Sequence, residues 1–418
     1  MKDELTPLTG TGKNTFGGWA ATLVDSLDTL WIMGLKTEFY DAAAAAATLD
    51  WSATEDGAAN LFETTIRHLG GLLSAYDLSG ELALLQKARE LGEMLYVAFD
   101  TPNRLPGFWI NFQDARDGRQ VAGVHDPSAS PGSLTLEMTR LSQLTDDPKF
   151  YDAADRVTQF LATVQNDTLL PGMWPVALDF QHEEARDNTF SLGALADSLY
   201  EYLPKMHALM GGVDTTYETL YRVASEVVAG NLLYRPMIPD KNAGILFSGD
   251  LRINDGRRDF LSESQHLTCF TGGMFALGGR LLEIDEHVKI GEQLARGCGW
   301  AYGSFPTGVM PEIFDVLPCE TLEPCEWDEE RWRRDGDTRL AKGFRHARDA
   351  RYILRPEAIE SIFIMYRITA NPEWQELAWT MFEAIKAVTR TEFANAAIED
   401  VTNANSRKID SMEVSFDG

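Results

Sequence analysis

Residues 133–164 read SLTLEMTRLSQL, then TDDP, then KFYDAADRVTQFLATV, and together they have the pattern of a helical hairpin. The first part, 133–144, places apolar residues at helical spacing, and the last part, 150–164, has the same spacing with a more polar face. The segment between them, Thr145-Asp146-Asp147-Pro148, strongly predicts a turn, because Asp favours turns and Pro cannot continue a helix. This stretch predicts two helices joined by a short turn.

The same unit recurs along the rest of the chain. Each copy has an apolar first helix that contains Gly or Ala, a short polar turn and a more polar amphipathic second helix. The further copies pair residues 19–35 with 39–49, 61–76 with 81–99, 190–209 with 217–233, 266–282 with 286–300, and 356–368 with 373–388. A seventh first helix begins at 410–413, but the sequence ends at Gly418. We therefore expect six hairpins followed by an incomplete seventh.

These hairpins predict an all-α fold. Strand patterns are sparse and short, as at 107–112 and 244–247. First helices that are apolar around most of their circumference must be buried, which indicates an inner ring of helices covered by an outer ring. That arrangement is an (α/α) barrel or a helical solenoid, and an ordinary multi-helix globule is the alternative. In a barrel, residues 1–418 would form a single domain.

Charge and hydropathy limit the kinds of partner. The formal net charge of -27 repels phosphate, so nucleic acid and anionic membrane surfaces are poor partners. No run of about 18 apolar residues is present, so no transmembrane segment is predicted, and the N-terminus has no signal-peptide core. The four cysteines show no metal-site spacing and do not fix the compartment by themselves.

Several acidic residues lie inside the apolar first helices. Glu63, Asp197, Glu357 and Glu360 are each flanked by apolar residues. Each also has a purely structural interpretation: Asn60 and Glu63 fit a capping box, Glu357 can complement a helix dipole next to Pro356, and Asp197 can be hydrogen-bonded locally.

Acids on different inner helices would all point into one pore. Their mutual repulsion there destabilises the fold, so such a cluster indicates a function that needs it. Cation binding and glycoside hydrolysis both use such a cluster, and hydrolysis needs one carboxyl group to protonate the leaving oxygen and another to activate water. Arg67 and Arg355 lie beside the two glutamates, where they would keep part of the cluster ionised and hold hydroxyl groups.

At these segments the sequence resembles the class I α-1,2-mannosidases of glycoside hydrolase family 47, from Asp3 to about Phe416. The similar stretches are Gly17-Gly18-Trp19, Thr22 to Leu35, Asn60 to Tyr76, Gly193 to Leu203, His266 to Gly279, and Tyr352 to Arg367. The resemblance implies one catalytic (α/α)7 barrel that removes terminal α-1,2-linked mannose from high-mannose N-glycans. It also implies inversion at the anomeric carbon, a bound Ca²⁺ and a monomer.

The resemblance also assigns roles. Glu63 matches the general acid, Glu357 the base that activates water, and Asp197 a third essential carboxylate, with the acid and base labels open among the three. His266 matches an active-site histidine, although a core histidine is the default from the sequence alone. The remaining matches are sugar-contacting residues of the pore: Arg67, Arg355, Glu360 and Glu413.

The cysteines gain an interpretation from the same resemblance. Cys269 and Cys298 match the disulfide of the family, and Cys319 and Cys325 resemble a second pair found in fungal-type members. Disulfides indicate an oxidising compartment. The resemblance therefore implies the secretory pathway, in the endoplasmic reticulum or its membrane, in the Golgi, or outside the cell.

The sequence departs from the family pattern in three places. Residues 414–418 replace the segment whose Thr supplies the direct Ca²⁺ contacts, so we expect no direct protein ligand for the metal and a weakly held or absent Ca²⁺. The N-terminus begins at the Asp-Glu-Leu segment of the family, so the chain reads as truncated at both ends. Ser130 stands where many members carry an active-site Glu.

Two other functions compete with the hydrolase. A catalytically weak or inactive glycan-binding member, of the type that marks proteins for degradation in the endoplasmic reticulum, would fit the missing Thr. An unrelated (α/α) enzyme such as a terpene cyclase would need an acidic metal-binding cluster on a helix, which the sequence does not show. Retention of Glu63, Asp197, Glu357 and His266 favours hydrolysis.

Overall fold

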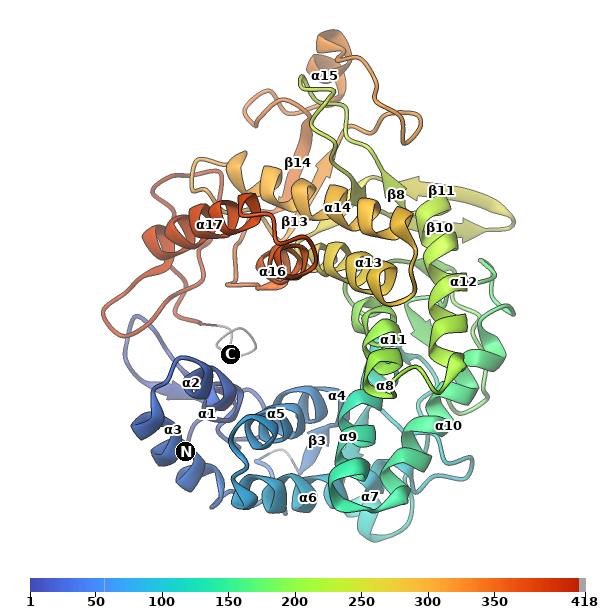
Figure 1. Ribbon diagram of the computed structural model, residues 1–418, viewed down its shortest axis with the longest axis vertical. Helices are drawn as coiled ribbons and strands as arrows, with labels where there is room; N and C mark the ends of the chain where they lie inside the picture. The colour runs from blue at the N-terminus through green and yellow to red at the C-terminus, as the bar shows by residue number, and fades with distance from the viewer. Residues whose placement is uncertain (56, 413–418) are drawn as a thin grey trace. The chain divides into compact units, whose positions relative to one another are not determined.

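The computed structural model describes residues 1–55 and 57–412, which divide into two compact units (Figure 1). Among the described residues, the first unit contains Met1–Asp167, Ala177–Arg186 and Ser411–Met412. The second contains Thr168–Val176 and Asp187–Asp410. None of the helices in the described ranges has both the length and the apolarity that a membrane crossing needs.

The first unit holds three of the predicted hairpins. Their turns follow the local chemistry: Gly80 ends one helix with a left-handed φ of 75°, and Asp147 accepts a hydrogen bond from the backbone of Lys149 at the start of another. The helices are α1 Ala21–Asp25, α2 Leu27–Ile32 and α3 Lys36–Ala46; α4 Leu61–Glu63, the π-helix η1 Thr64–Leu69, α5 Gly70–Ser79, α6 Leu82–Tyr96 and the 3₁₀ turn η2 Val97–Phe99; α8 Ala129–Gly132, α9 Thr135–Thr145 and α10 Pro148–Val164.

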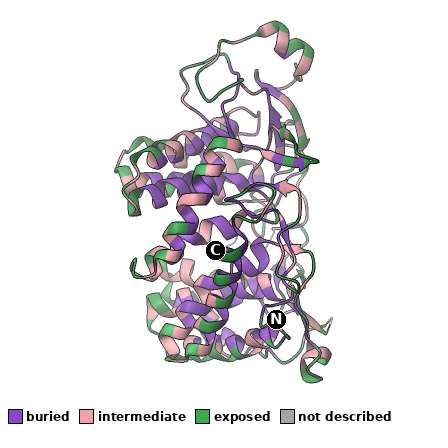
Figure 2. Ribbon diagram, turned by 90° about the vertical axis from the view of Figure 1, so that its right-hand side faces the viewer, coloured by how far each residue is buried: buried purple, intermediate pink, exposed green. Residues whose placement is uncertain are grey.

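The second unit holds the other three hairpins. They are α11 Asp197–Leu209 with α12 Thr215–Asn231, the 3₁₀ turn η3 Leu267–Cys269 and α13 Phe270–Leu281 with α14 Asp285–Gly303, and α16 Glu357–Thr369 with α17 Glu373–Thr389. Most helices of both units have a buried side and an exposed side (Figure 2). The pattern is that of amphipathic hairpins whose apolar sides form the core.

Helix α13 is the most deeply buried helix of the second unit and lies beside α14 and α16 (Figure 1). Glycines allow this close packing. A Cβ atom on Gly272 would lie 3.0 Å from the backbone nitrogen of Ala295, and one on Gly291 would lie 2.6 Å from the carbonyl oxygen of Gly272. The backbones of α13 and α14 are therefore in direct contact.

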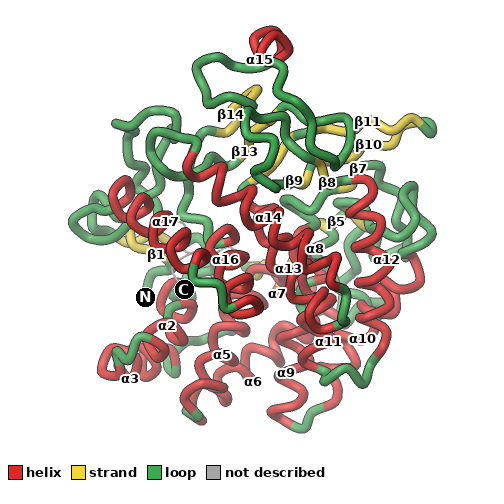
Figure 3. Tube along the Cα trace, turned by 45° about the horizontal axis from the view of Figure 1, so that its top comes forward, coloured by secondary structure: helices red, strands yellow, loops and turns green. Residues whose placement is uncertain are grey.

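Short strands connect the hairpins (Figure 3). Two three-stranded antiparallel sheets lie in the second unit, in the orders β12-β13-β14 and β11-β10-β7. Their strands are β7 Thr189–Phe190, β10 Asp250–Asn254, β11 Arg257–Leu261, β12 Glu263–Gln265, β13 Ile313–Val316 and β14 Phe344–Asp349. The two-stranded pairs are β1 Glu4–Leu5 with β2 Gly12–Lys13, β3 Ala58–Asn60 with β4 Trp109–Asn111, β5 Asp126–Pro127 with β6 Ala177–Leu178, and β8 Leu233–Tyr234 with β9 Phe247–Ser248.

The sequence pattern is wrong at one helix start. A helix is predicted from residue 190, whereas α11 begins at Asp197 and Phe190 belongs to β7. The side-chain amide of Gln265 fills the space beside Gly193 and accepts a hydrogen bond from the backbone nitrogen of Ala194 at 2.9 Å. This contact across the fold holds the segment out of the helix. Three short helices are also absent from the predicted hairpins: α7 Phe112–Arg116, α8 and α15 Glu329–Asp335.

Candidate active site

His266 and Glu357 form the centre of the site in the second unit. Strand β12 ends at Gln265, and the backbone nitrogen of His266 then donates to the carbonyl oxygen of Glu312 at 2.8 Å, which fixes the position of the histidine. Glu357 is the first residue of α16. Nδ1 of His266 lies 3.3 Å from Oε2 of Glu357. His266 is fully buried, but its partner is a carboxylate, so it is not an ordinary core histidine.

Arg355 links the same carboxylate to a second one. Its Nη1 lies 3.8 Å from Oε1 of Glu357, and its Nε donates to Oε2 of Glu312 at 2.5 Å. Burial raises the pKa of Glu312 above its usual range, although Arg355 opposes the shift. The sequence analysis missed Glu312, whose only signal is its position after Met310-Pro311 in an otherwise apolar stretch.

Two buried tyrosines complete the surroundings of His266. The hydroxyl of Tyr302, on α14, lies 2.8 Å from Nε2 of His266, and Tyr352 packs against both rings. Burial raises the pKa of each phenol far above its usual value, so both stay protonated in the physiological range. Neither tyrosine has a local sequence signal, because each reaches the site through tertiary packing.

A second group of acids extends from α11. Asp197, Glu201 and Lys205 follow one another at intervals of four and share one side of that helix. The ammonium group of Lys205 pairs with Glu201 and lies 3.3 Å from Oε1 of Glu360 on α16. Burial raises the pKa of Glu360 to about 8, with Glu201 adding to the shift. It raises the pKa of Asp197 to about 7, with the charges of Glu201 and Glu357 adding to it.

The first unit holds Glu63 and Arg67 together. Oδ1 of Asn60 accepts a hydrogen bond from the backbone nitrogen of Glu63 at 2.9 Å, so the capping interpretation of Asn60 is confirmed. The carboxylate of Glu63 does not cap; its Oε2 lies 2.6 Å from Nη2 of Arg67. Arg67 belongs to the π-helix η1, a distortion that is frequent at functional sites.

Asp25 belongs to the same cluster and was missed by the sequence analysis. Burial raises its pKa to about 7; Arg67 opposes the shift, and Asp28 and Glu63 add to it. Its signal was of the same kind as that of Glu63, an acid inside an apolar first helix. The guanidinium of Arg67 lies 4.6 Å from the ring of Phe16.

The structure thus groups the predicted residues in two sets. His266, Asp197, Glu357, Glu360 and Arg355 lie close together in the second unit, and Glu63 and Arg67 lie together in the first. The convergence of both sets on one pore stays a prediction. Glu413 lies outside the described residues. Ser130 is buried on α8, and its hydroxyl has no hydrogen-bond partner in the part of the chain that is described.

The described residues do not fit a directly coordinated Ca²⁺. Within residues 1–55 and 57–412, no three His, Cys, Asp or Glu side chains are grouped so that they could hold a metal ion. The two acids Glu201 and Glu360 already share the ammonium group of Lys205. A resident Ca²⁺ would need ligands other than these side chains.

Both implied disulfides are present. Cys269 and Cys298 are bonded and join the start of the fifth hairpin to its second helix, with their Cα atoms 6.0 Å apart. Cys319 and Cys325 are bonded in the connection between β13 and α15. The predicted pairing of all four cysteines is therefore confirmed.

Helical hairpins that carry a group of buried acids fit a glycoside hydrolase, a class of enzyme that uses a pair of carboxyl groups. The chain belongs to glycosyl hydrolase family 47, because the model of that family matches residues 1–416. The predicted family is therefore confirmed.

Individual relatives agree with this assignment. The chain is 35% identical to a mannosyl-oligosaccharide alpha-1,2-mannosidase of Coccidioides posadasii, over 98% of this chain and 78% of that protein. It is 32% identical to a mannosyl-oligosaccharide alpha-1,2-mannosidase of Penicillium citrinum, over 98% and 79%. The solved alpha-1,2-mannosidase of Trichoderma reesei matches with a TM-score of 0.88 and 29% identity, over 100% of this chain and 86% of that one. This likeness confirms the all-α class and the (α/α)7 barrel fold. Residues 413–418, which include most of the predicted seventh hairpin, lie outside the described ranges.

Proposed function

We propose that the protein is an inverting α-1,2-mannosidase that removes terminal α-1,2-linked mannose from high-mannose N-glycans. The observation that supports this most directly is the contact of Glu357 with both His266 and Arg355. A carboxylate held between an imidazole and a guanidinium at the start of α16 is placed to take a proton from a water molecule, which is the task of the base. The names of the relatives in Coccidioides posadasii and Penicillium citrinum support the same substrate.

In this mechanism Glu357 takes a proton from a water molecule. The water oxygen attacks the anomeric carbon from the face opposite the leaving group, and the glycosidic bond to the leaving oxygen breaks. A carboxylic acid on the other side delivers its proton to that oxygen. Attack from the opposite face inverts the configuration, so the first product is β-mannose.

Asp197 is the better candidate for the acid among the open assignments. An acid catalyst has to be protonated near neutral pH, and burial raises the pKa of Asp197 to about 7. Glu63 lies 2.6 Å from the guanidinium of Arg67, and this ion pair engages the carboxyl group that an acid catalyst would have to present to the leaving oxygen. We assign the carboxylate of Glu63 to stabilisation of positive charge at the anomeric carbon, and Arg67 and Arg355 to binding of the sugar hydroxyl groups.

The remaining parts of the proposal concern the setting of the enzyme. We propose that residues 1–418 act as one catalytic domain, which the match of the family model to residues 1–416 supports. The disulfides support the secretory pathway or the cell exterior. We expect Glu360 and Glu413 to contact the sugar, a monomeric enzyme, and a weakly held or absent Ca²⁺.

Hydrolysis of α-1,2-mannobiose tests the proposal. We expect release of free mannose whose first-formed anomer is β, followed in real time by proton NMR, and little change on addition of a chelator. Initial formation of α-mannose would contradict the inverting mechanism. Binding of the disaccharide without release of mannose would instead favour the glycan-binding alternative.

A further inference from the structure

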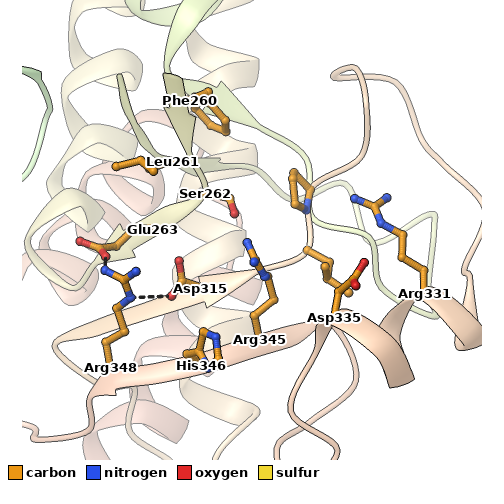
Figure 4. Close-up of a pocket in the computed structure, with 12 residues that line it drawn as sticks. Phe260, Leu261, Ser262, Glu263, Asp315, Arg331, Asp335, Arg345, His346 and Arg348 are labelled. Carbon is orange, nitrogen blue, oxygen red and sulfur yellow. Dashed lines mark hydrogen bonds and ion pairs between the residues drawn. The ribbon is translucent and has the colours of Figure 1, made fainter. Parts of the chain in front are cut away.

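A cavity of 410 Å³ opens on the outer part of the sheet β12-β13-β14 in the second unit (Figure 4). Its walls come from β11, β12, β13, β14 and α15. The strands β12 and β13 that lead to it also lead to the candidate active site. Asp315 lies three residues after Glu312, and Glu263 lies three residues before His266, a separation of about 10 Å along a strand.

Two polar atoms in the wall of this cavity are buried without a hydrogen-bond partner. Nε of Arg345 is one of them, and Oδ2 of Asp315 is the other, among the residues that the structure describes. Nε of Arg348 lies 3.0 Å from that oxygen, which makes an ion pair without the direction of a hydrogen bond. A buried donor without a hydrogen bond is costly, so an acceptor on a bound molecule would stabilise Arg345. The carboxylate of Asp315 is held by the ion pair with Arg348 and can still accept a hydrogen bond from a hydroxyl group.

The charged side chains of the cavity wall disfavour binding of a simple ion. Arg348 is shared by Glu263 and Asp315, so a second anion there would be repelled. At the other end, the pKa of Asp335 is lowered mainly by its hydrogen bond from Arg334, with the charges of Arg331 and Arg345 adding to the shift, and a cation there would meet the guanidinium groups of Arg331 and Arg345. A hydroxyl group meets neither obstacle, because it donates to a carboxylate and accepts from a guanidinium.

An aromatic ring completes the cavity. The side chain of Phe260 is 39% exposed, and its ring is held edge-on against Tyr234 with the centroids 5.7 Å apart. A fixed, partly exposed ring beside polar groups can cover the C–H face of a sugar while those groups bind its hydroxyls. The volume is in the range of sites that hold small molecules.

We propose that this cavity is a second carbohydrate site that binds a neutral sugar ring. Asp315 accepts a hydrogen bond from one hydroxyl, Arg345 donates to another, and the ring of Phe260 covers the apolar face. The inference goes beyond the proposed hydrolysis and does not depend on it, because none of these three residues takes part in the proposed reaction.

Met237 offers a local reporter for a binding experiment. It packs with Leu317 of the cavity wall and with Trp332, and its sulfur lies 3.9 Å from Nη1 of Arg331. In protein labelled with ¹³C at the methionine methyl groups, we expect the Met237 signal to shift and saturate on titration with methyl α-D-mannopyranoside. Loss of a hydrogen bond to a charged group predicts that Arg345→Leu weakens this binding about tenfold or more. Arg339→Leu, which removes an exposed guanidinium outside the cavity wall, should leave it unchanged.

Further ligands and variants decide whether the proposal holds. A Met237 signal that does not move with the sugar, or moves equally in Arg345→Leu, would overturn the proposal, as would a shift produced by inorganic phosphate and not by the sugar. If Arg345→Leu has a reduced melting temperature, Phe260→Ala and Asp315→Asn provide the same comparison. Mannobiose hydrolysis by Arg345→Leu should equal that of the wild type. Absence of hydrolysis in the wild type would contradict the proposed function but leave the titration of Met237 interpretable.

Discussion

Nδ1 of His266 lies 3.3 Å from Oε2 of Glu357, and the other ring nitrogen of the histidine lies 2.8 Å from the hydroxyl of Tyr302. In the tautomer of His266 whose proton is on Nδ1, that proton faces the carboxylate and Nε2 accepts the hydrogen bond from the phenol. Tyr302 would then act on Glu357 through the histidine, as a positioning residue.

The first prediction follows from this chain of contacts. Tyr302→Phe removes the hydroxyl without removing the ring, so we expect kcat on α-1,2-mannobiose to fall roughly tenfold with little change in KM. The limb of the pH profile that reports the base should move as well, which a purely structural role would not produce. Unchanged kcat and an unchanged pH profile would show that the contact is not used.

Glu357→Gln keeps the size of the side chain and removes its basicity. We expect kcat to fall by about a hundredfold to ten-thousandfold, the range for loss of a general base, as measured by mannose release. Glu383→Gln, an exposed position on α17, is the matched control and should keep full activity. Unchanged activity in Glu357→Gln would contradict the assignment of Glu357 as the base.

The raised pKa of Asp197 predicts how the activity falls on the alkaline side of the pH profile. The acid must carry its proton, and with a pKa of about 7 its protonated fraction falls about tenfold per pH unit above that value. We therefore expect kcat/KM to decline above about pH 7, and Asp197→Asn to abolish that limb along with most of the activity. A profile that stays flat to pH 9 would point to a different acid.

Asp25 gives a prediction about stability. Its folded-state pKa is raised, so the folded state binds its proton more tightly than the unfolded state between about pH 4 and 7. Stability is lost as the pH rises through that window, because a buried carboxylate then has to be ionised. Asp25→Asn should raise the melting temperature at pH 8 and have a much smaller effect at pH 4. Equal effects at both pH values would contradict the assigned cause.

The disulfides allow a comparison of two loops. Closing the 29-residue separation of Cys269 and Cys298 stabilises by roughly 3–4 kcal/mol in the chain-entropy description, and the 6-residue separation of Cys319 and Cys325 by roughly 2 kcal/mol. We expect the double Cys→Ser variant of the first pair to lose more in melting temperature than that of the second. The reverse order would mean that strain or local packing outweighs loop closure.

The hairpins could be predicted because their determinants are local. The turn at 145–148 contains its own capping and helix-breaking residues, and the structure forms it as expected, with Asp147 capping α10. The start of α11 could not be predicted, because the side chain that displaces it, Gln265, comes from a distant strand. The same reason explains the pairing of β10 with β7 and of β13 with β12 and β14, because these partners are far apart in sequence. The hairpin of β10 and β11 is different, because its Asp255-Gly256 turn is a local signal that the sequence analysis did not use.

The residues of the candidate site also differ in whether the sequence alone reveals them. Glu63, Asp197, Glu357 and Glu360 stand out as acids in apolar helices, and the burial that raises the pKa of Asp197 and Glu360 agrees with that signal. Glu312 is recognised only through its contact with Arg355, which lies 43 residues away. Tyr302 and Lys205 are likewise ordinary residues of amphipathic helices until tertiary packing places them beside the acids.

The glycines of α13 limit how far the helices near the site can move relative to each other. The backbone nitrogen of Gly273 donates to the hydroxyl of Ser361 at 2.8 Å, and that hydroxyl donates to the carbonyl oxygen of Cys269, so α13 and α16 are fastened to each other one turn away from Glu357. A Cβ atom on Gly273 would lie 2.7 Å from Cδ1 of Ile364 on α16, so an added methyl group would force the two helices apart or displace that side chain. The position of Glu357 is therefore set by the close contact of α16 with α13.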